Sequence, residues 1–204
     1  MLIKTKRLFG VISLTLLVLT SCAIGNRTAS NGHNAITTMG NIDVNANNTA
    51  GHLEVTNGNI NISHHARVKS VEVLNGNIMI DDYSQAGSLT TTNGNIDIGE
   101  NVNIDNSINS LNGNIRIAQR SIIGRNVNTT TGDVFIGNGV IIKGDIIFKK
   151  PGYWSSKIEQ EKPVLEIKQS AVVEGNIHLY RSIELRLPED FPSEKIIRYG
   201  NKRS

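Results

Sequence analysis

The stretch Asn75-Gly76-Asn77-Ile78-Met79-Ile80 defines the architecture, because close copies of it recur along the chain. The copies begin at Gly40, Gly58, Gly76, Gly94, Gly113 and Gly132, spaced 18, 18, 18, 19 and 19 residues apart. Degenerate copies follow at Gly144 and Gly175. A fixed period of this length is typical of proteins built from units that stack on one another.

Each unit contains short strands in which apolar and polar residues alternate, such as 70–74 and Ile78-Met79-Ile80. An alternating strand buries one face only, so a single unit has no core of its own. Stacking the units aligns inward residues such as Ile78 into columns. The repeat therefore predicts an all-β fold, a single-stranded β-solenoid (β-helix) with about 18 residues per turn over 36–148. Seven or eight rungs at about 4.8 Å would form a rod roughly 35–40 Å long.

Glycine and asparagine mark the corners of the predicted coil. The repeat glycines stand where the chain must turn, and glycine accepts a positive φ without steric cost. Asparagine also tolerates left-handed geometry, and its amide can bond to the equivalent residue one rung away. We expect internal ladders of this kind from Asn57, Asn75, Asn93 and Asn112.

The winding direction follows from the phase of the apolar residues. A six-residue spacing typical of left-handed coils runs through Ile62, Val68, Leu74, Ile80, Ala86, Thr92, Ile98 and Ile104. The later 19-residue turns break that phase, so we predict a right-handed coil.

Residues 1–21 have the layout of a signal peptide. Lys4, Lys6 and Arg7 precede an apolar run from Leu8 to Leu19 that is too short to span a bilayer of roughly 30 Å. The run Leu19-Thr20-Ser21-Cys22 resembles the lipobox of bacterial lipoproteins, which implies that Cys22, the only cysteine, carries a diacylglycerol and an N-acyl chain. Several acyl chains together anchor a protein stably. Since Ala23 rather than Asp follows Cys22, we expect the outer membrane, facing the periplasm.

The remaining segments complete the expected organisation. Residues 22–35, rich in Asn, Gly, Ser and Thr, predict a flexible tether. Residues 149–163 interrupt the repeat and predict an extruded loop, in which Tyr153 and Trp154 either contact a partner or cover a hydrophobic edge. Residues 164–182 would form the last turn, and 183–204 a charged, proline-containing cap that blunts the open sheet edge.

Charge excludes one class of partner. Of 21 basic residues, Lys4, Lys6 and Arg7 lie in the signal segment, so 18 remain against 18 acidic residues. The mature chain is neutral and gives no reason to expect a nucleic-acid partner.

The repeats, the segment Lys150-Pro151-Gly152-Tyr153-Trp154 and the return Val172-Val173-Glu174-Gly175 together resemble a group of bacterial lipoproteins. That group is similar to the bactofilin-type polymer-forming and adhesin-like β-solenoid families, over roughly 36–180. The resemblance implies a structural or interaction role, with self-association as one form of it, and it carries no catalytic residues. The lipobox and the charged cap depart from the bactofilin pattern, which puts filament formation in doubt.

Chemistry-bearing residues are sparse. Nine aromatic residues leave little for a sugar-stacking platform, and Asp43, Asp81, Asp82 and Asp97 form no recognisable acid–base pair. The five histidines, His33, His52, His64, His65 and His178, are expected to be solvated. Adjacent His64 and His65 would point to opposite faces of a strand, so no metal site is expected, and no cofactor.

Two functions remain at this point. The first is a membrane-anchored, non-enzymatic scaffold that meets an envelope protein or glycan. The alternative is a carbohydrate-active or acyl-transferring β-helix enzyme. A groove lined by two carboxylates and an Arg or Lys would favour the alternative, and a smooth ladder of Asn, Ser and Thr would count against it.

Overall fold

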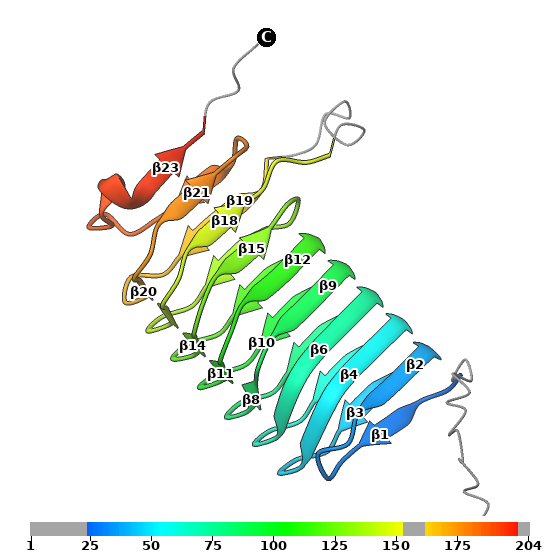
Figure 1. Ribbon diagram of the computed structural model, residues 1–204. Coiled ribbons are helices and arrows are strands. Elements are labelled where there is room, and N and C mark those ends of the chain that lie inside the picture. Colours follow the sequence, from blue (N-terminus) through cyan, green and yellow to red (C-terminus); the bar gives the residue numbers. More distant parts are fainter. Residues whose placement is uncertain (1–23, 153–161, 200–204) are drawn as a thin grey trace, which may run out of the picture.

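The computed structural model describes residues 24–152 and 162–199, and it shows an all-β solenoid (Figure 1). The named strands pair in parallel, and each lies against its equivalents in the turns before and after. The fold class predicted from the repeat is therefore confirmed. Within the described ranges the named helical element is a short 3-10 turn, η2 (Ser193–Lys195).

The strands form three faces, and in two of the turns one long strand, β4 (Thr49–Asn57) or β6 (Arg67–Asn75), runs across two of them. The nine-stranded face contains, in spatial order, β1 (Arg27–Ala29), β3 (Ile42–Val44), β5 (Ile60–Ile62), β7 (Ile78–Ile80), β10 (Ile96–Ile98), β13 (Ile115–Ile117), β16 (Val134–Ile136), β19 (Val164–Ile167) and β22 (Glu184–Arg186). At about 4.8 Å per rung these strands span roughly 38 Å along the axis.

The other two faces form one continuous 14-stranded sheet. The long-strand face contains β2 (Ala35–Met39), β4 (Thr49–Asn57), β6 (Arg67–Asn75), β9 (Leu89–Asn93), β12 (Ile108–Asn112), β15 (Val127–Thr129), β18 (Ile146–Phe148), β21 (Ile177–Leu179) and β23 (Ile196–Arg198). The short-strand face contains β8 (Gln85–Ala86), β11 (Asn103–Ile104), β14 (Ile122–Ile123), β17 (Ile141–Ile142) and β20 (Val172–Val173). Because β6 pairs with both β8 and β9, it joins the two faces.

The core is a set of aligned apolar columns. On the nine-stranded face Ile60, Ile78 and Ile96 stack in register and are fully buried. The inward assignment of Ile78 is thus confirmed. The six-residue phase is wrong at two positions, since Leu74 is 47% exposed and Thr92 is half-buried. The chain turns a corner between β6 and β7, so the buried residues there are not evenly spaced in sequence.

The repeat glycines allow the rungs to approach closely. Gly58, Gly76, Gly94 and Gly113 have φ values between 140° and 150°. A Cβ on Gly76 would overlap the carbonyl oxygen of Gly58 in the preceding rung. Gly132 has no positive φ, but a Cβ there would overlap the carbonyl oxygen of Gly113 in the same way. The glycines therefore serve rung-to-rung contact as well as the turn.

The predicted asparagine ladder forms, although in a different setting. Asn75 Nδ2 donates to Asn57 Oδ1 at 3.0 Å, Asn93 Nδ2 to Asn75 Oδ1 at 2.9 Å, and Asn112 Nδ2 to Asn93 Oδ1 at 2.9 Å. These side chains are exposed rather than internal, and none of the four asparagines has a positive φ. The following glycine takes the positive φ, so each asparagine can end its strand in extended geometry.

Left-handed residues other than glycine occupy another corner. Asn47, His65, Tyr83, Asn101 and Arg120 have φ values from 55° to 61° and follow one another at intervals of 18 or 19 residues. This corner lies at the turn before the short-strand face. The repeated motif gives no sign of this corner, because four different residue types occupy it in five turns.

Both ends of the coil extend beyond their predicted limits. The range 22–35 is not wholly a tether, because it contains β1, which pairs with β3, and because Ala29 in β1 is buried. The small buried side chain of Ala29 is enough to complete this first rung, because the backbone of β1 is already paired with β3. The cap beyond residue 183 likewise contains β22 and β23, which pair with β19 and β21. The turn at 164–182 is thus followed by one further, less buried turn.

The insertion leaves the register intact. Val134 pairs with Leu165 and Ile136 with Ile167, although 31 residues separate each pair. The insertion lies between β18 and β19, and β19 pairs in register with β16. Two distant parts of the sequence therefore become neighbours on the nine-stranded face.

Candidate functional site

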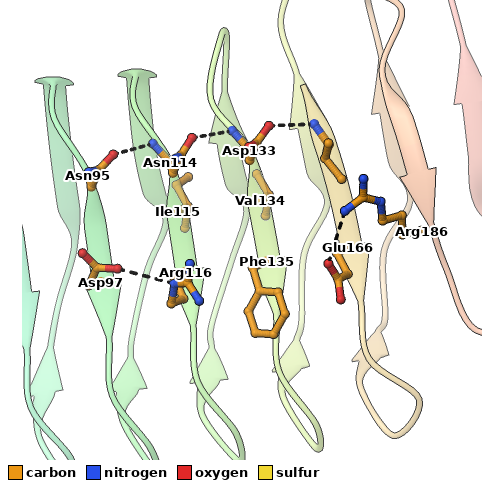
Figure 2. Close-up of a pocket in the computed structure, with 11 residues that line it drawn as sticks. Asn95, Asp97, Asn114, Ile115, Arg116, Asp133, Val134, Phe135, Glu166 and Arg186 are labelled. Atoms are coloured by element: carbon orange, nitrogen blue, oxygen red, sulfur yellow. Dashed lines mark hydrogen bonds and ion pairs between the residues drawn. The ribbon is translucent and has the colours of Figure 1, made fainter. Parts of the chain in front are cut away.

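A groove crosses the outer surface of the nine-stranded face between β10 and β22 (Figure 2). It has a volume of about 240 Å³. Consecutive rungs place Asp97, Arg116, Phe135, Glu166 and Arg186 in one outward column, because the strand registers align these five positions. Each follows an inward residue in its strand, which is why all five point outward.

Opposite charges pair within this column. Arg116 Nε lies 3.8 Å from Asp97 Oδ1, and Lys168 Nζ lies 2.6 Å from Glu166 Oε1. Arg186 contacts Glu166 at 4.0 Å and Glu184 at 2.7 Å. Of the charged residues that line the groove, three are acidic and two basic, for a net charge of −1. The charges largely neutralise one another, so the groove has no strong preference for a polyion.

Phe135 supplies the one aromatic ring among the groove's lining residues. It stands between Arg116 and Glu166 in Figure 2. The Arg116 guanidinium carbon and the Lys168 ammonium nitrogen lie 5.4 Å and 5.5 Å from the ring centroid. Cations at this distance are attracted to the ring face and hold it in place. The ring is thus a positioned, half-buried apolar surface among polar groups.

A second ladder forms one edge of the groove. Asn95 Oδ1 accepts the peptide N–H of Asn114, and Asn114 Oδ1 accepts that of Asp133, both at 2.9 Å. Asp133 Oδ1 accepts the N–H of Val164 at 2.8 Å. Within the described ranges, Nδ2 of Asn95, Nδ2 of Asn114 and Oδ2 of Asp133 form no protein hydrogen bond. Two donors and one acceptor therefore stand one rung apart beside Phe135.

The carboxylates differ in spacing. Asp97 and Glu166 are three rungs apart, about 14 Å. Asp133 and Glu166 occupy neighbouring rungs and are offset by two residues along the strand, which separates their Cα atoms by about 8 Å. Inverting glycosidases hold their two carboxyl groups roughly 6.5–9.5 Å apart. Of these two pairs, Asp133 and Glu166 have the separation nearer to that range, although the value of about 8 Å joins Cα atoms rather than carboxyl groups.

Glu166 is held in its ionised form. The hydrogen bond from Lys168, with the positive charges of Lys168, Arg186 and Arg116, lowers the pKa of Glu166 below its usual value despite partial desolvation. A lowered pKa suits an acceptor or a base and not a proton donor at neutral pH. Asp133 is exposed to solvent, whereas general-acid carboxyls are usually enclosed by apolar groups.

A serine–histidine–glutamate cluster lies on the long-strand face. His52 Nδ1 lies 2.8 Å from Ser70 Oγ, and His52 Nε2 lies 3.5 Å from Glu54 Oε2. The order resembles that of a nucleophile, a base and an orienting acid. Ser70 is in the middle of β6, however, where the next N–H, that of Val71, bonds to Ser88. Paired backbone of this kind offers no N–H to an oxyanion.

Aromatic residues cluster where the long-strand face ends. The rings of Tyr180 and Tyr199 stack in parallel at 4.1 Å, and His178 Nδ1 lies 2.9 Å from the Tyr199 hydroxyl. The hydrogen bond with Tyr180, together with desolvation and nearby negative charge, raises the pKa of Tyr199. Its phenol therefore stays protonated at neutral pH, and the cluster acts as a polar aromatic surface.

Three of the five histidines, His33, His64 and His65, are exposed as predicted. His52 and His178 are half-buried and both have hydrogen-bond partners, whereas the exposed ring of His33 contacts the Ser30 carbonyl oxygen. His64 and His65 lie in a turn rather than a strand, with ring centroids 5.7 Å apart, and His65 stacks on Tyr83 at 5.2 Å. The opposite-face argument was therefore wrong. Even so, the described residues contain no cluster of metal-ligating side chains.

The sequence-predicted residues fall into two sets. Cys22, Tyr153 and Trp154 lie outside the described residues. The repeat glycines and asparagines lie at corners and do not converge on a site. Sequence reasoning missed Phe135, Glu166 and Arg186 as neighbours; the signal was the alignment of Val164-Leu165-Glu166-Ile167 with Val134-Phe135-Ile136 across the insertion. No helix in the described part of the chain is long and apolar enough to cross a bilayer.

Comparison of the chain with protein-family models, with curated proteins and with solved structures gave no match.

Proposed function

We propose that this protein is a lipid-anchored, non-enzymatic scaffold of the bacterial cell envelope. In this proposal Cys22 carries the lipid and the rod faces the periplasm from the outer membrane. The observation that supports it best is the position of β1, which begins at Arg27. Only residues 23–26 separate Cys22 from the first strand, so the anchor would lead almost directly into a rigid rod.

Rigidity is what a scaffold of this kind requires. Most rungs are hydrogen-bonded to two neighbours, and the exposed and groove-edge asparagine ladders add side-chain bonds between them. With its first rung nearest the membrane, the groove would begin four rungs away, about 19 Å along the axis. The groove would then meet an envelope protein or glycan, and the segment around Tyr153 and Trp154 would provide a second contact.

Lipidation is tested with Cys22→Ala in cells. The wild-type protein is expected in the membrane fraction, because acyl chains anchor it. The variant is expected in the soluble periplasmic fraction or as uncleaved precursor. A variant that fractionates with membranes like the wild type would contradict the anchor.

Partner binding is tested by crosslinking in whole cells. Crosslinks to envelope protein, to glycan or to a second copy of the chain would each identify what the scaffold holds. Absence of any crosslink from the nine-stranded face, with the protein correctly located, would contradict a contact role for that face.

The groove also favours a second candidate, a carbohydrate-active enzyme. A groove with two carboxylates and an arginine is the feature expected of it, and the Cα separation of Asp133 and Glu166 is compatible with the carboxyl spacing of an inverting enzyme. The lowered pKa of Glu166 and the exposure of Asp133 argue against it. Release of reducing ends from envelope polysaccharide by the purified protein, abolished by Asp133→Asn and by Glu166→Gln, would replace the scaffold proposal with this one.

A further inference from the structure

We infer that the groove on the nine-stranded face binds a neutral glycan chain bearing N-acetyl groups. This inference rests on the proposed non-enzymatic function, since it assigns a ligand to the same face. It is carried by Phe135 and by the unpaired polar atoms of Asn95, Asn114 and Asp133 beside it.

Charge excludes the simplest alternatives. Arg116 is paired with Asp97, and Lys168 and Arg186 are paired with Glu166. A polyanion would have to break these pairs to reach the cations, and it would also meet the carboxylate of Asp133, which has no ion pair among the described residues. A polycation would find that single carboxylate free and would have to break the pairs to reach the other two. A neutral ligand can bind while all of them persist.

The hydrogen-bonding groups match an acetamido group. An acetamido group has one carbonyl acceptor and one N–H donor. The amide NH₂ groups of Asn95 and Asn114 can donate to such carbonyls, and Asp133 Oδ2 can accept such an N–H. The ladder uses Oδ1 of all three residues, so the remaining atoms are held at fixed positions without cost to the fold.

The ring of Phe135 supplies the apolar part of the site. The C–H bonds on one face of a pyranose carry partial positive charge and pack favourably against the negative face of an aromatic ring. The flexible ammonium of Lys168 can leave the ring while it keeps its bond to Glu166. The ring would then contact one sugar while the asparagine edge contacts its substituent.

Geometry favours a sugar chain over a peptide strand. The backbone N–H groups of this face are used within the sheet, so the face offers side chains only and cannot pair with an added strand.

The test is calorimetric titration of the full chain, purified from membranes in detergent. The probes are chitohexaose, which bears N-acetyl groups, cellohexaose, which has the same linkage without them, and polygalacturonate, a polyanion. We expect chitohexaose to bind with little salt dependence and more tightly than the other two. Equal binding of cellohexaose, or tighter, salt-sensitive binding of polygalacturonate, would overturn the inference.

Variants locate the site. Phe135→Leu keeps an apolar side chain and should weaken chitohexaose binding about tenfold. Asp133→Asn keeps an oxygen for the Val164 N–H but removes the acceptor from the groove, and it should weaken binding as well. Met79→Ala is the matched control, since Met79 lies in the same outward column outside the groove. Equal losses in all three variants would overturn the assignment.

Failure of the inference differs from failure of the proposed function. Absence of chitohexaose binding, together with crosslinks from this face to envelope protein, would overturn the glycan and leave the scaffold. Cleavage of chitohexaose would overturn the scaffold itself.

Discussion

Substitution of Gly76 by alanine tests the closest contact between rungs. Gly76 has a φ of 144°, which alanine rarely adopts, and its new Cβ would overlap the carbonyl oxygen of Gly58. Strained backbone of this kind costs about 1–3 kcal/mol. The overlap involves backbone in a paired rung, which cannot rotate away, so separation of the rungs adds a similar amount. We expect a total loss of about 4 kcal/mol.

The assay is urea denaturation followed by circular dichroism. With an m-value of about 2–3 kcal/mol/M, this loss lowers the midpoint by roughly 1.3–2 M. Gly139→Ala is the control. Its φ is 68°, its Cβ would come no closer than 3.6 Å to Arg120, and the preceding residue in its column, Arg120, is itself left-handed. That variant should lose only about 1 kcal/mol. Equal midpoints for the two variants would refute the argument from rung contact.

Three further predictions concern the core, the groove and the last turn. Ile78→Asp places a charge in a fully buried column and should lower the free energy of unfolding by at least about 3 kcal/mol. The side chain of Met79 is 43% exposed, so Met79→Asp should change the free energy of unfolding by less than about 0.5 kcal/mol. Similar melting temperatures for the two variants would contradict the inward and outward assignments. Because the folded pKa of Glu166 is lowered, its stabilising contribution is present above the unfolded value near 4.3 and is lost as pH falls through the folded value. Glu166→Gln should therefore flatten the dependence of Tm on pH in that acidic range. An unchanged profile would show that the pairing of Glu166 with Lys168 contributes nothing to stability. Lys195 Nζ donates to the carbonyl oxygens of Val173 at 2.6 Å and Glu174 at 3.2 Å, next to the outermost strand of the short-strand face. Lys195→Met should therefore expose that sheet edge and promote association, measured by light scattering, whereas Lys195→Arg should stay monodisperse. A monodisperse Lys195→Met variant would show that the lysine does not protect the edge.

The fold could be predicted because the sequence states it several times. Each copy of the motif repeats the same strand, corner and inward pair, so an error in one copy is corrected by the others. The columns through Ile60, Ile78 and Ile96 follow directly from that redundancy. The N-terminal end was misjudged because only part of the motif is present there: Gly25-Asn26 matches Gly40-Asn41, but Arg27-Thr28-Ala29 lacks the apolar residues of β3, with which it pairs.

The candidate groove could not be predicted for a different reason. Phe135 and Glu166 are 31 residues apart in sequence, and they become neighbours because β19 pairs in register with β16 after the insertion. The burial of Leu165 and Ile167, which pair with Val134 and Ile136, sets that register, but the insertion separates the two strands by more than one repeat period. The pairing of His52 with Ser70 differs, since the two residues are 18 residues apart and the repeat period itself places them at equivalent positions on neighbouring turns.

The groove-edge asparagine ladder has a consequence for how such a rod changes length. Each rung accepts a peptide N–H from the next rung and donates its own to the previous one, as Asn77 does between Asn59 and Asn95. The upper surface of one unit therefore fits the lower surface of any other, and not only that of its present neighbour. Duplication or loss of one 18-residue unit would shift the distal groove by a single step of about 4.8 Å. Reach is thus an inherited quantity that can change in small, discrete increments while every interface stays the same.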